Sequence, residues 1–317
     1  MVRRAEDRMA VDKGDRALVL ILNFNGFEDT SRCVESLRSD PDVPREDVVV
    51  VDNGSSDGSP ERLKNAFPGL AVFETGSNLG FAKGYNWAIK KFMGQGYGSM
   101  LLLNNDTIVH RGAVGELRET LKADKTIGVV GPLVLNMGAE AVQSAGIGIQ
   151  WEKSKPVFLL NGKKAVDVPE EIRDVDFVSG SAMLVRNEAL DKVGLFAEHF
   201  FMYAEEEDLC LRMRSAGYKV VCNTKARVEH KMEATVSKYP ELRARYYPRN
   251  RFLVLKRHGT GGQFFRFTVW MIGFELPPLM FWDLVDGRLS VAYARVRGVI
   301  GGLLSSMSEK SLRSASR

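Results

Sequence analysis

Four acidic residues in a row, Glu205 to Asp208, stand between an aromatic run and an apolar helical pattern. Adjacent negative charges repel one another, and burying a carboxylate without a partner is costly. A helix that begins near Ala204 would place all four in its first turn, where the helix dipole favours negative charge by about 0.3–1 kcal/mol each. The sequence therefore predicts a helix that opens with this acidic turn.

The spacing along that helix separates the roles of the four acids. Asp208 stands one turn before Arg212, which predicts an (i, i+4) ion pair. Glu207 lies on the side of Arg214 and is either solvated or paired. Glu206 shares a face with apolar residues, so we expect its carboxylate to point into the protein. Desolvation raises the pKa of a carboxyl group, and a carboxylate of raised pKa suits a general base.

Polar segments follow the apolar runs in the first half of the chain. They read NFNG, VDNGSSDGS, TGSNLGFAKG and LNNDT. Ligands of parallel α/β sheets bind at the carboxyl ends of the strands, so these segments predict a nucleotide site. The sequence has no GxGxxG after the first apolar run and no GxxxxGK[ST], which argues against a dinucleotide dehydrogenase and a P-loop NTPase.

Two residues at predicted strand ends are candidate metal ligands. Asp106 ends the LNND segment and His230 ends ARVEH. Carboxylate oxygens suit Mg²⁺ or Mn²⁺ that is bridged to phosphates. Asp106 would alternatively cap the next helix through an Asx turn, and His230 would be a structural histidine. The residue types alone leave these alternatives open.

Strands separated by helices predict a parallel sheet with helices on both faces. We expect strands over residues 17–24, 47–53, 70–75, 99–106, 126–135, 218–223 and 226–230. We expect helices over residues 28–39, 59–67, 81–93 and 111–123. We expect a strand followed by a helix over residues 175–190, and irregular structure over residues 136–174. After Pro240 the pattern is basic, aromatic and helical.

Composition and charge indicate an intracellular α/β protein with a basic appendage. The chain has 317 residues, of which 44% are hydrophobic, and a net charge of +4. Residues 240–317 hold 13 Lys and Arg against 5 Asp and Glu, a net charge of +8, which leaves −4 for the rest. Three scattered cysteines favour a reducing compartment, and the charged residues 1–16 are no signal peptide. We expect a cytoplasmic protein without a nucleic-acid partner, whose basic end contacts something anionic.

Six segments occur in an order that resembles a known family. They are LILNFNG, VVVVDNGSSDGS, NLGFAKGYNWA, LLLNNDT, the stretch from VSGSAM to AGYKVV, and ARVEH. Over about residues 17–257 the chain resembles the family 2 inverting glycosyltransferases of GT-A fold, and most of all their rhamnosyltransferase-like members. The resemblance implies a Rossmann-like, mostly parallel sheet with helices on both faces. It also implies a charged tail (1–16), a catalytic domain (17–239) and a basic helical region (240–317).

The resemblance assigns roles at the positions that match the family motifs. Glu206 would be the general base, and Asp106 and His230 would bind Mg²⁺ or Mn²⁺ against the donor diphosphate. Residues implied in binding the nucleotide sugar or the acceptor are Asn23, Asn25, Asp52, Asn53, Asn78, Gly80, Lys83, Gly84, Asn86, Asn105, Gly180, Ser181 and Glu205. The sequence departs from the family pattern twice, with one acid rather than two in NND, and with Glu206 where an aspartate is usual.

The basic region after residue 240 has two open interpretations. The resemblance puts Arg249 and Arg251 near the donor phosphates, whereas an amphipathic helix would leave them solvated. Residues 264–285 are apolar but interrupted by Arg266, Glu275 and two prolines. They fit either an element lying in the membrane interface or a homodimer contact. A membrane location would suit a saccharide acceptor carried on a polyprenyl diphosphate.

Two other functions compete with glycosyl transfer. A sugar-nucleotide pyrophosphorylase would need a glycine-rich, basic loop after the first strand, where this chain has the acidic and polar NFNGFEDTS. A non-catalytic nucleotide-sugar-binding or scaffold protein would be indicated by loss of the acidic cluster or of Asp106, and both are present. The residues therefore favour glycosyl transfer, and the resemblance implies a dTDP- or UDP-sugar as donor, with rhamnose or a similar sugar, and a role in building surface polysaccharide.

Overall fold

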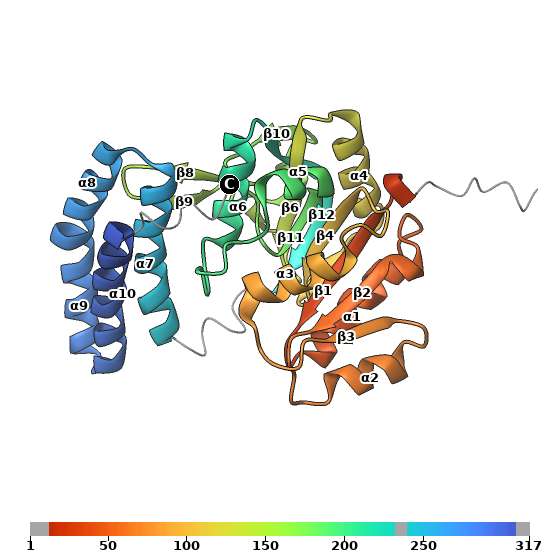
Figure 1. The fold of residues 1–317 in the computed structure, drawn as a ribbon, viewed down its shortest axis with the longest axis horizontal. Helices are drawn as coiled ribbons and strands as arrows, with labels where there is room; N and C mark the ends of the chain where they lie inside the picture. The colour runs from red at the N-terminus through yellow and green to blue at the C-terminus, as the bar shows by residue number, and fades with distance from the viewer. Residues whose placement is uncertain (1–12, 232–239, 309–317) are drawn as a thin grey trace, which may run out of the picture.

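The computed structural model describes residues 13–231 and 240–308, so most of the predicted tail and the predicted boundary at residue 239 lie outside the described residues. The first half of the chain forms four neighbouring parallel strands in the order β4-β1-β2-β3 (Figure 1). Their bounds are β1 Ala17–Asn23, β2 Val48–Asp52, β3 Ala71–Glu74 and β4 Ser99–Asn104. The carboxyl ends of β1 and β2 meet where Asn23 pairs with Asp52.

The second half extends this sheet with strands of both directions. The main order continues from β4 through β11, β6 and β12 to β10, and β5 and β7 pair with β12 and β6. Their bounds are β5 Thr107–Val109, β6 Ile127–Asn136, β7 Val142–Ser144, β10 Ile172–Asp174, β11 Ala182–Arg186 and β12 Lys219–His230. β11 runs antiparallel to both neighbours, whereas β12 is parallel to β6. The predicted mostly parallel α/β sheet is confirmed.

Two expectations about the second half were wrong in detail. Residues 136–174 are not irregular throughout, because they also contain a hairpin of β8 Ile147–Gln150 and β9 Lys155–Phe158. Its short strands are partly exposed and too brief to give a clear apolar alternation. Residues 218–230 form one strand rather than two, because the pairing with β6 continues past an irregularity between Asn223 and Arg227.

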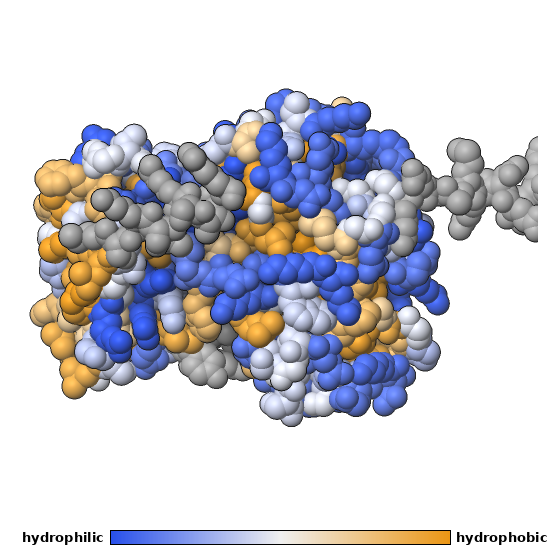
Figure 2. Space-filling view, in the orientation of Figure 1, coloured by the Kyte–Doolittle hydropathy of each residue, from blue (hydrophilic) through white to orange (hydrophobic). Residues whose placement is uncertain are grey.

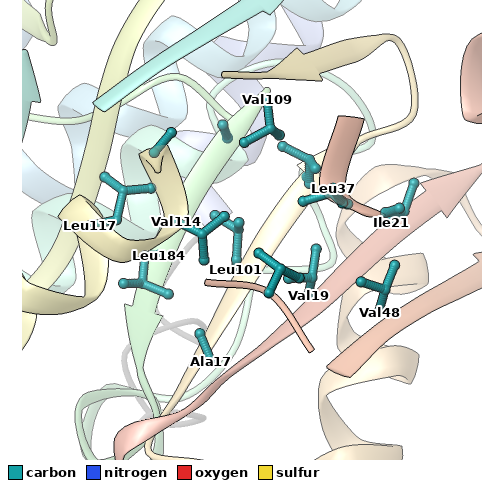
Figure 3. Packing of buried hydrophobic residues seen from close by; sticks show 14 of the residues in the cluster. Ala17, Val19, Ile21, Leu37, Val48, Leu101, Val109, Val114, Leu117 and Leu184 are labelled. Atoms are coloured by element: carbon teal, nitrogen blue, oxygen red, sulfur yellow. The ribbon is translucent and has the colours of Figure 1, made fainter. Parts of the chain in front are cut away.

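Helices cover both faces of the sheet because successive apolar side chains of each strand point to opposite faces. Val19 and Ile21 of β1 face α1, α2 and α4, while Leu18 and Leu20 face α3, α5 and α6. Figure 3 shows the first of these cores, where side chains of α1 and α4 meet those of the strands. The bounds are α1 Phe27–Arg38, α2 Ser59–Ala66, α3 Gly80–Phe92, α4 Ala113–Ala123, α5 Asn187–Val193 and α6 Glu205–Ser215.

The C-terminal region is helical, as predicted, and lies at one end of the molecule (Figure 1). Its elements are α7 Pro240–His258, α8 Gly261–Trp270, the π-helical segment η4 Met271–Glu275, α9 Leu276–Val285 and α10 Leu289–Ser308. Gly298 and Gly302 let α10 approach α7 closely, since a Cβ at Gly298 would lie 2.2 Å from the carbonyl oxygen of Arg245. Among the helices of the described residues, none has the length and apolar character needed to cross a bilayer.

Candidate functional site

The carboxyl ends of β1 and β2 are joined by buried side chains that hydrogen-bond to one another. Asn23 donates from Nδ2 to Asp52 Oδ1 at 2.6 Å, and its Oδ1 accepts from the Thr30 hydroxyl at 2.7 Å. Asp52 is 1% exposed and also accepts from the backbone N–H and hydroxyl of Ser55. Asn25, at a positive φ of 50°, accepts from the Ser56 N–H and so ties the first loop to the second.

A second set of contacts holds the loop before α3 against the end of β2. The Asn53 side chain accepts from the Leu79 N–H at 3.0 Å and donates to the Gly80 carbonyl at 3.1 Å and to Asn78. Gly84 packs against this point, because a Cβ there would lie 3.0 Å from Leu22 and 3.3 Å from Asn53 Nδ2. The amino end of α3 is thereby fixed beside Asp52 and Asn53, where backbone N–H groups suit an anionic ligand.

The candidate metal ligands are neighbours. The Nε2 atom of His230 lies 3.3 Å from Asp106 Oδ1, and its Nδ1 lies 3.0 Å from the amide oxygen of Gln143. With Nδ1 held by the Gln143 side chain, Nε2 and the Asp106 carboxylate face each other, and the two could ligate one cation. The pair adjoins the nucleotide edge through Asn105, which donates to Asn23 and Thr30.

Asp106 and His230 together fit an open Mg²⁺ or Mn²⁺ site better than a closed site, in which protein side chains supply all the metal ligands. Within residues 13–231 and 240–308 there is no cluster of three or more His, Cys, Asp or Glu side chains suited to a metal. Mg²⁺ is commonly held by one or two protein carboxylates together with substrate phosphates and water. A metal ion with two protein ligands would therefore keep coordination positions free for the oxygen atoms of a diphosphate.

The acidic turn opens α6, as the sequence predicts. It follows two residues with left-handed backbones, Tyr203 (φ 68°) and Ala204 (φ 72°), a conformation that is costly for residues other than glycine. The negative charges of the turn lie at the amino end of the helix, where its dipole favours them.

Two of the four acids are neutralised by cations. Asp208 pairs with Arg212 at 2.9 Å, which confirms the predicted (i, i+4) contact, and also with Arg257 and His258. Burial alone would raise the pKa of Asp208, but the His258 hydrogen bond and the two guanidinium groups lower it to about 2. Glu207 is buried and paired rather than solvated, since both of its oxygens accept from Arg251, at 3.0 and 2.5 Å.

The other two acids lack such partners. Glu205 is 5% exposed and its Oε2 has no hydrogen-bond partner among the described residues. Burial and the charge of Glu206 raise the pKa of Glu205 well above its ordinary value. Burial also raises the pKa of Glu206 to about 7, although this side chain is only half-buried. Glu206 is thus the acid of this turn that combines access with a raised pKa.

Glu206 faces the turn that precedes β11. A Cβ at Gly180 would lie 3.6 Å from Glu206 Cδ and 3.2 Å from Phe81 of α3. The adjacent Ser181 accepts a backbone hydrogen bond from Asn104, at the end of β4. A continuous set of contacts therefore runs from Glu206 through this turn to the strand end that precedes Asp106.

Two predicted ligands have structural roles instead. Asn86 is buried and exchanges hydrogen bonds with the backbone of Phe196, so its amide holds the loop before the acidic turn rather than a substrate. Arg251 is 2% exposed and bound to Glu207 and the Ser154 carbonyl, so it is the counterion of Glu207 rather than a phosphate ligand. Lys83 is exposed on α3.

Helix α7 supplies contacts to the acidic turn that sequence reasoning missed. Asn250 donates from Nδ2 to the carbonyls of Met202 and Tyr203, both at 2.8 Å, and Arg249 donates to the carbonyl of His199. These bonds hold the backbone that leads into α6. Nothing in the spacing of Asn250 indicates this role, and Gln143 was likewise missed because it lies in the segment expected to be irregular.

Comparisons with known proteins identify the family and the fold. Residues 18–194 match the family model described as Glycosyl transferase family 2. The chain is 26% identical over 240 residues to the N-acetylglucosaminyl-diphospho-decaprenol L-rhamnosyltransferase of Mycobacterium tuberculosis, covering 68% of this chain and 76% of that protein. It is 26% identical over 203 residues to the low-salt glycan biosynthesis hexosyltransferase Agl10 of Haloferax volcanii, covering 63% and 62%.

Solved structures share the fold. The mannosyltransferase PcManGT from Pyrobaculum calidifontis, in complex with GDP-Man and Mn²⁺, has a TM-score of 0.55 at 15% identity and covers 95% of this chain and 90% of its own. GalNAc-T7 with UDP, GalNAc and Mn²⁺ has a TM-score of 0.56 at 14% identity, covering 85% and 57%. The fold is the predicted GT-A fold. The chain belongs to glycosyl transferase family 2 and is a glycosyltransferase.

Proposed function

We propose that this glycosyltransferase moves a sugar, with inversion, from a nucleoside diphosphate to a hydroxyl group of a saccharide acceptor, with Glu206 as the general base. The observation that carries the proposal is the contrast within one helical turn. Glu206 is the half-buried acid whose pKa lies near 7, and it faces Gly180, whereas Glu207 and Asp208 are held by cations. A carboxylate with a pKa near the working pH is suited to accept a proton.

The proposed reaction is a single displacement. As the acceptor oxygen attacks the anomeric carbon, its proton passes to the Glu206 carboxylate. The bond between the anomeric carbon and the diphosphate oxygen breaks, and the electron pair leaves with the nucleoside diphosphate. Attack opposite the leaving group inverts the anomeric centre. The charge pairs of Glu207 and Asp208 keep these two acids from competing for that proton, and Glu205 is buried away from the acceptor.

The edge formed by Asp52, Asn53 and the start of α3 would bind the nucleotide. Asp106 and His230 would hold Mg²⁺ or Mn²⁺, which when bound neutralises charge on the departing diphosphate. His230 is kept in orientation by Gln143. The Gly180–Ser181 turn, which faces Glu206, would form the acceptor side of the site.

The names of the relatives support a finer assignment. A rhamnosyltransferase acting on a lipid-linked N-acetylglucosamine and a hexosyltransferase of glycan biosynthesis are both similar to this chain. We therefore propose rhamnose or a hexose, delivered as a dTDP- or UDP-sugar, and a polyprenyl-diphosphate-linked saccharide acceptor in cell-envelope synthesis.

The test compares Glu206→Gln with Glu188→Gln, a matched change at an exposed carboxylate of α5. Donor binding is measured by thermal shift with UDP and dTDP, each with Mg²⁺ or Mn²⁺, and transfer is measured with a panel of dTDP- and UDP-sugars. Glu206→Gln is expected to keep the nucleotide-induced shift and to lose about 10²–10⁴-fold in transfer rate, while Glu188→Gln changes neither. Near-normal transfer by Glu206→Gln would overturn the assignment of the base.

The metal pair is tested separately with Asp106→Asn and His230→Gln. A ligand at a hundredfold excess over its dissociation constant stabilises the folded state by about 2.7 kcal/mol. Both variants are expected to lose the part of the nucleotide-induced shift that depends on Mg²⁺ or Mn²⁺. Unchanged metal-dependent shifts would show that the metal binds elsewhere, and no shift of the wild type with any nucleotide would overturn the donor site.

A further inference from the structure

Large apolar side chains gather on the outer face of the C-terminal helices. Of the 18 that are exposed among the described residues, 12 lie within residues 261–308. Phe265 and Phe274 are 68% and 70% exposed, on α8 and η4. Figure 2 shows hydrophobic surface at this end of the molecule, at the left of the view. Single exposed apolar residues are ordinary, but a gathering of this kind marks a contact surface.

A cavity of about 450 Å³ opens at the edge of this face, between α7, α9 and α10. Trp282, which is 58% exposed, belongs to both the cavity lining and the apolar face. Three arginines line the same cavity, Arg243, Arg288 and Arg295. A hydrophobic surface with guanidinium groups at its edge is the pattern by which proteins contact a lipid bilayer, with apolar side chains at the acyl boundary and cations at the phosphates.

The arginines of the cavity are ordered but not fully neutralised. The buried Asp283 holds Arg295 at 2.8 Å and Arg288 at 3.4 Å. Arg288 remains 50% exposed, and Arg243 is exposed. Arg288 also pairs with Asp286, at 2.6 Å, just outside the lining. Arg243 has no acidic partner among the described residues, so its exposed guanidinium group is available to an anionic group at the mouth of the cavity.

The wider charge of this region favours lipid over a second copy of the chain. Residues 240–308 contain 10 Lys and Arg and 4 Asp and Glu; two of the arginines, Arg251 and Arg257, pair with Glu207 and Asp208 of α6, which leaves this region a net charge of +4. A two-fold symmetric dimer through this face would bring two copies of the same positive surface together, and like charges across an interface are costly. An anionic bilayer would cover the same face with charge of the opposite sign.

The cavity is linked to the segment that leads into α6. Its wall includes Tyr247, whose ring packs edge-on against Tyr203 with centroids 6.0 Å apart. Tyr203 directly precedes Ala204 and the acidic turn of α6. A lipid surface at the cavity would therefore be connected to the acidic turn through one aromatic contact.

We propose that the face formed by α8, η4, α9 and α10 docks on an anionic lipid bilayer, with Arg243, Arg288 and Arg295 binding lipid phosphate at the cavity mouth. Docking needs no donor or transfer activity, so the proposal stands or falls independently of the proposed reaction. It would place the enzyme where a lipid-linked acceptor resides.

Vesicle co-sedimentation of the full chain tests this proposal. Vesicles of phosphatidylcholine alone are compared with vesicles that also contain phosphatidylglycerol. The double variant Phe265→Asp with Phe274→Asp is expected to weaken binding at least about tenfold. Arg243→Glu is expected to weaken binding to the phosphatidylglycerol vesicles about fivefold or more.

Matched controls lie on the catalytic domain. Val166→Asp changes an apolar residue that is 72% exposed, and Lys125→Glu repeats the charge reversal at an exposed site; neither is expected to change binding. Thermal unfolding of each variant checks that it is folded. Absence of wild-type binding, or equal binding by all variants, would overturn the proposal. A wild-type dimer in light scattering that the double variant converts to monomer would assign the face to a homodimer instead.

Discussion

The carboxyl edge of the sheet and the first turn of α6 are both rich in side-chain oxygen atoms, but their hydrogen bonding differs. At the sheet edge, Asn23, Asp52 and Asn53 bind one another and the neighbouring loops. In the α6 turn, neither Glu205 nor Glu206 pairs with a basic side chain among the described residues, and burial raises the pKa of both. The comparison separates a rigid, internally hydrogen-bonded surface from a turn whose carboxylates suit the proposed proton transfer.

The contrast recurs within the α6 turn itself. Glu207 and Asp208 are anchored by basic side chains, three of which (Arg251, Arg257 and His258) belong to α7, so this helix holds α6 in place. The anchors leave Glu205 and Glu206 as the acids of raised pKa, and Glu206 is the more accessible of the two. The appended helices thus support the proposed active site.

Removing an anchor is expected to have the largest effect on stability. Arg251→Met leaves the buried Glu207 carboxylate without its counterion, and breaking a buried pair in this way costs about 3–5 kcal/mol. Urea unfolding measures the loss. The double variant Arg251→Met with Glu207→Gln should recover much of it, because no buried charge is then left. A loss below about 1 kcal/mol in the single variant would contradict the anchoring role.

Breaking the sheet edge is expected to cost less. Asn53→Ala leaves the Leu79 N–H and the Gly80 carbonyl without their partner, at about 1–3 kcal/mol. The loop before α3 would loosen, and the thermal shift produced by UDP or dTDP would shrink. Asn65→Ala, at an exposed position on α2, is the control. An unchanged nucleotide shift in Asn53→Ala would show that this loop does not position the nucleotide.

The smallest expected effect is on the pH dependence of stability. The pKa of Glu206 is raised in the folded protein, so the folded state binds more protons than the unfolded state between pH 4.5 and about 7. Stability should therefore fall as pH rises through that window. Glu206→Gln should flatten this slope in thermal unfolding. The pKa of Asp208 is lowered in the folded protein, so its effect has the opposite sign. Its contribution to the stability of the folded state is lost as pH falls from about 4 towards 2. An equal slope in the variant would rule out Glu206 as its source.

The sequence predicts what is periodic or local. The apolar runs predict the parallel strands, and the spacing of Asp208 and Arg212 predicts their ion pair. It does not predict contacts between distant segments. Glu207 and Arg251 are 44 positions apart, and Asn86 binds a backbone 110 positions away. The sequence does not distinguish a polar residue that binds a ligand from one that binds the protein's own loops, and the structure engages both Asn86 and Arg251 in contacts within the protein.

The most direct test of the central claim is the pH profile of kcat/KM for sugar transfer by the wild-type enzyme. Glu206 must be ionised to accept the acceptor proton, and burial raises its pKa to about 7. The rate should therefore rise with pH and level off above a midpoint near 7. A profile that is flat from pH 5 to 8, or a midpoint near 4.5, the ordinary value for a glutamate, would contradict the assignment of Glu206 as the general base.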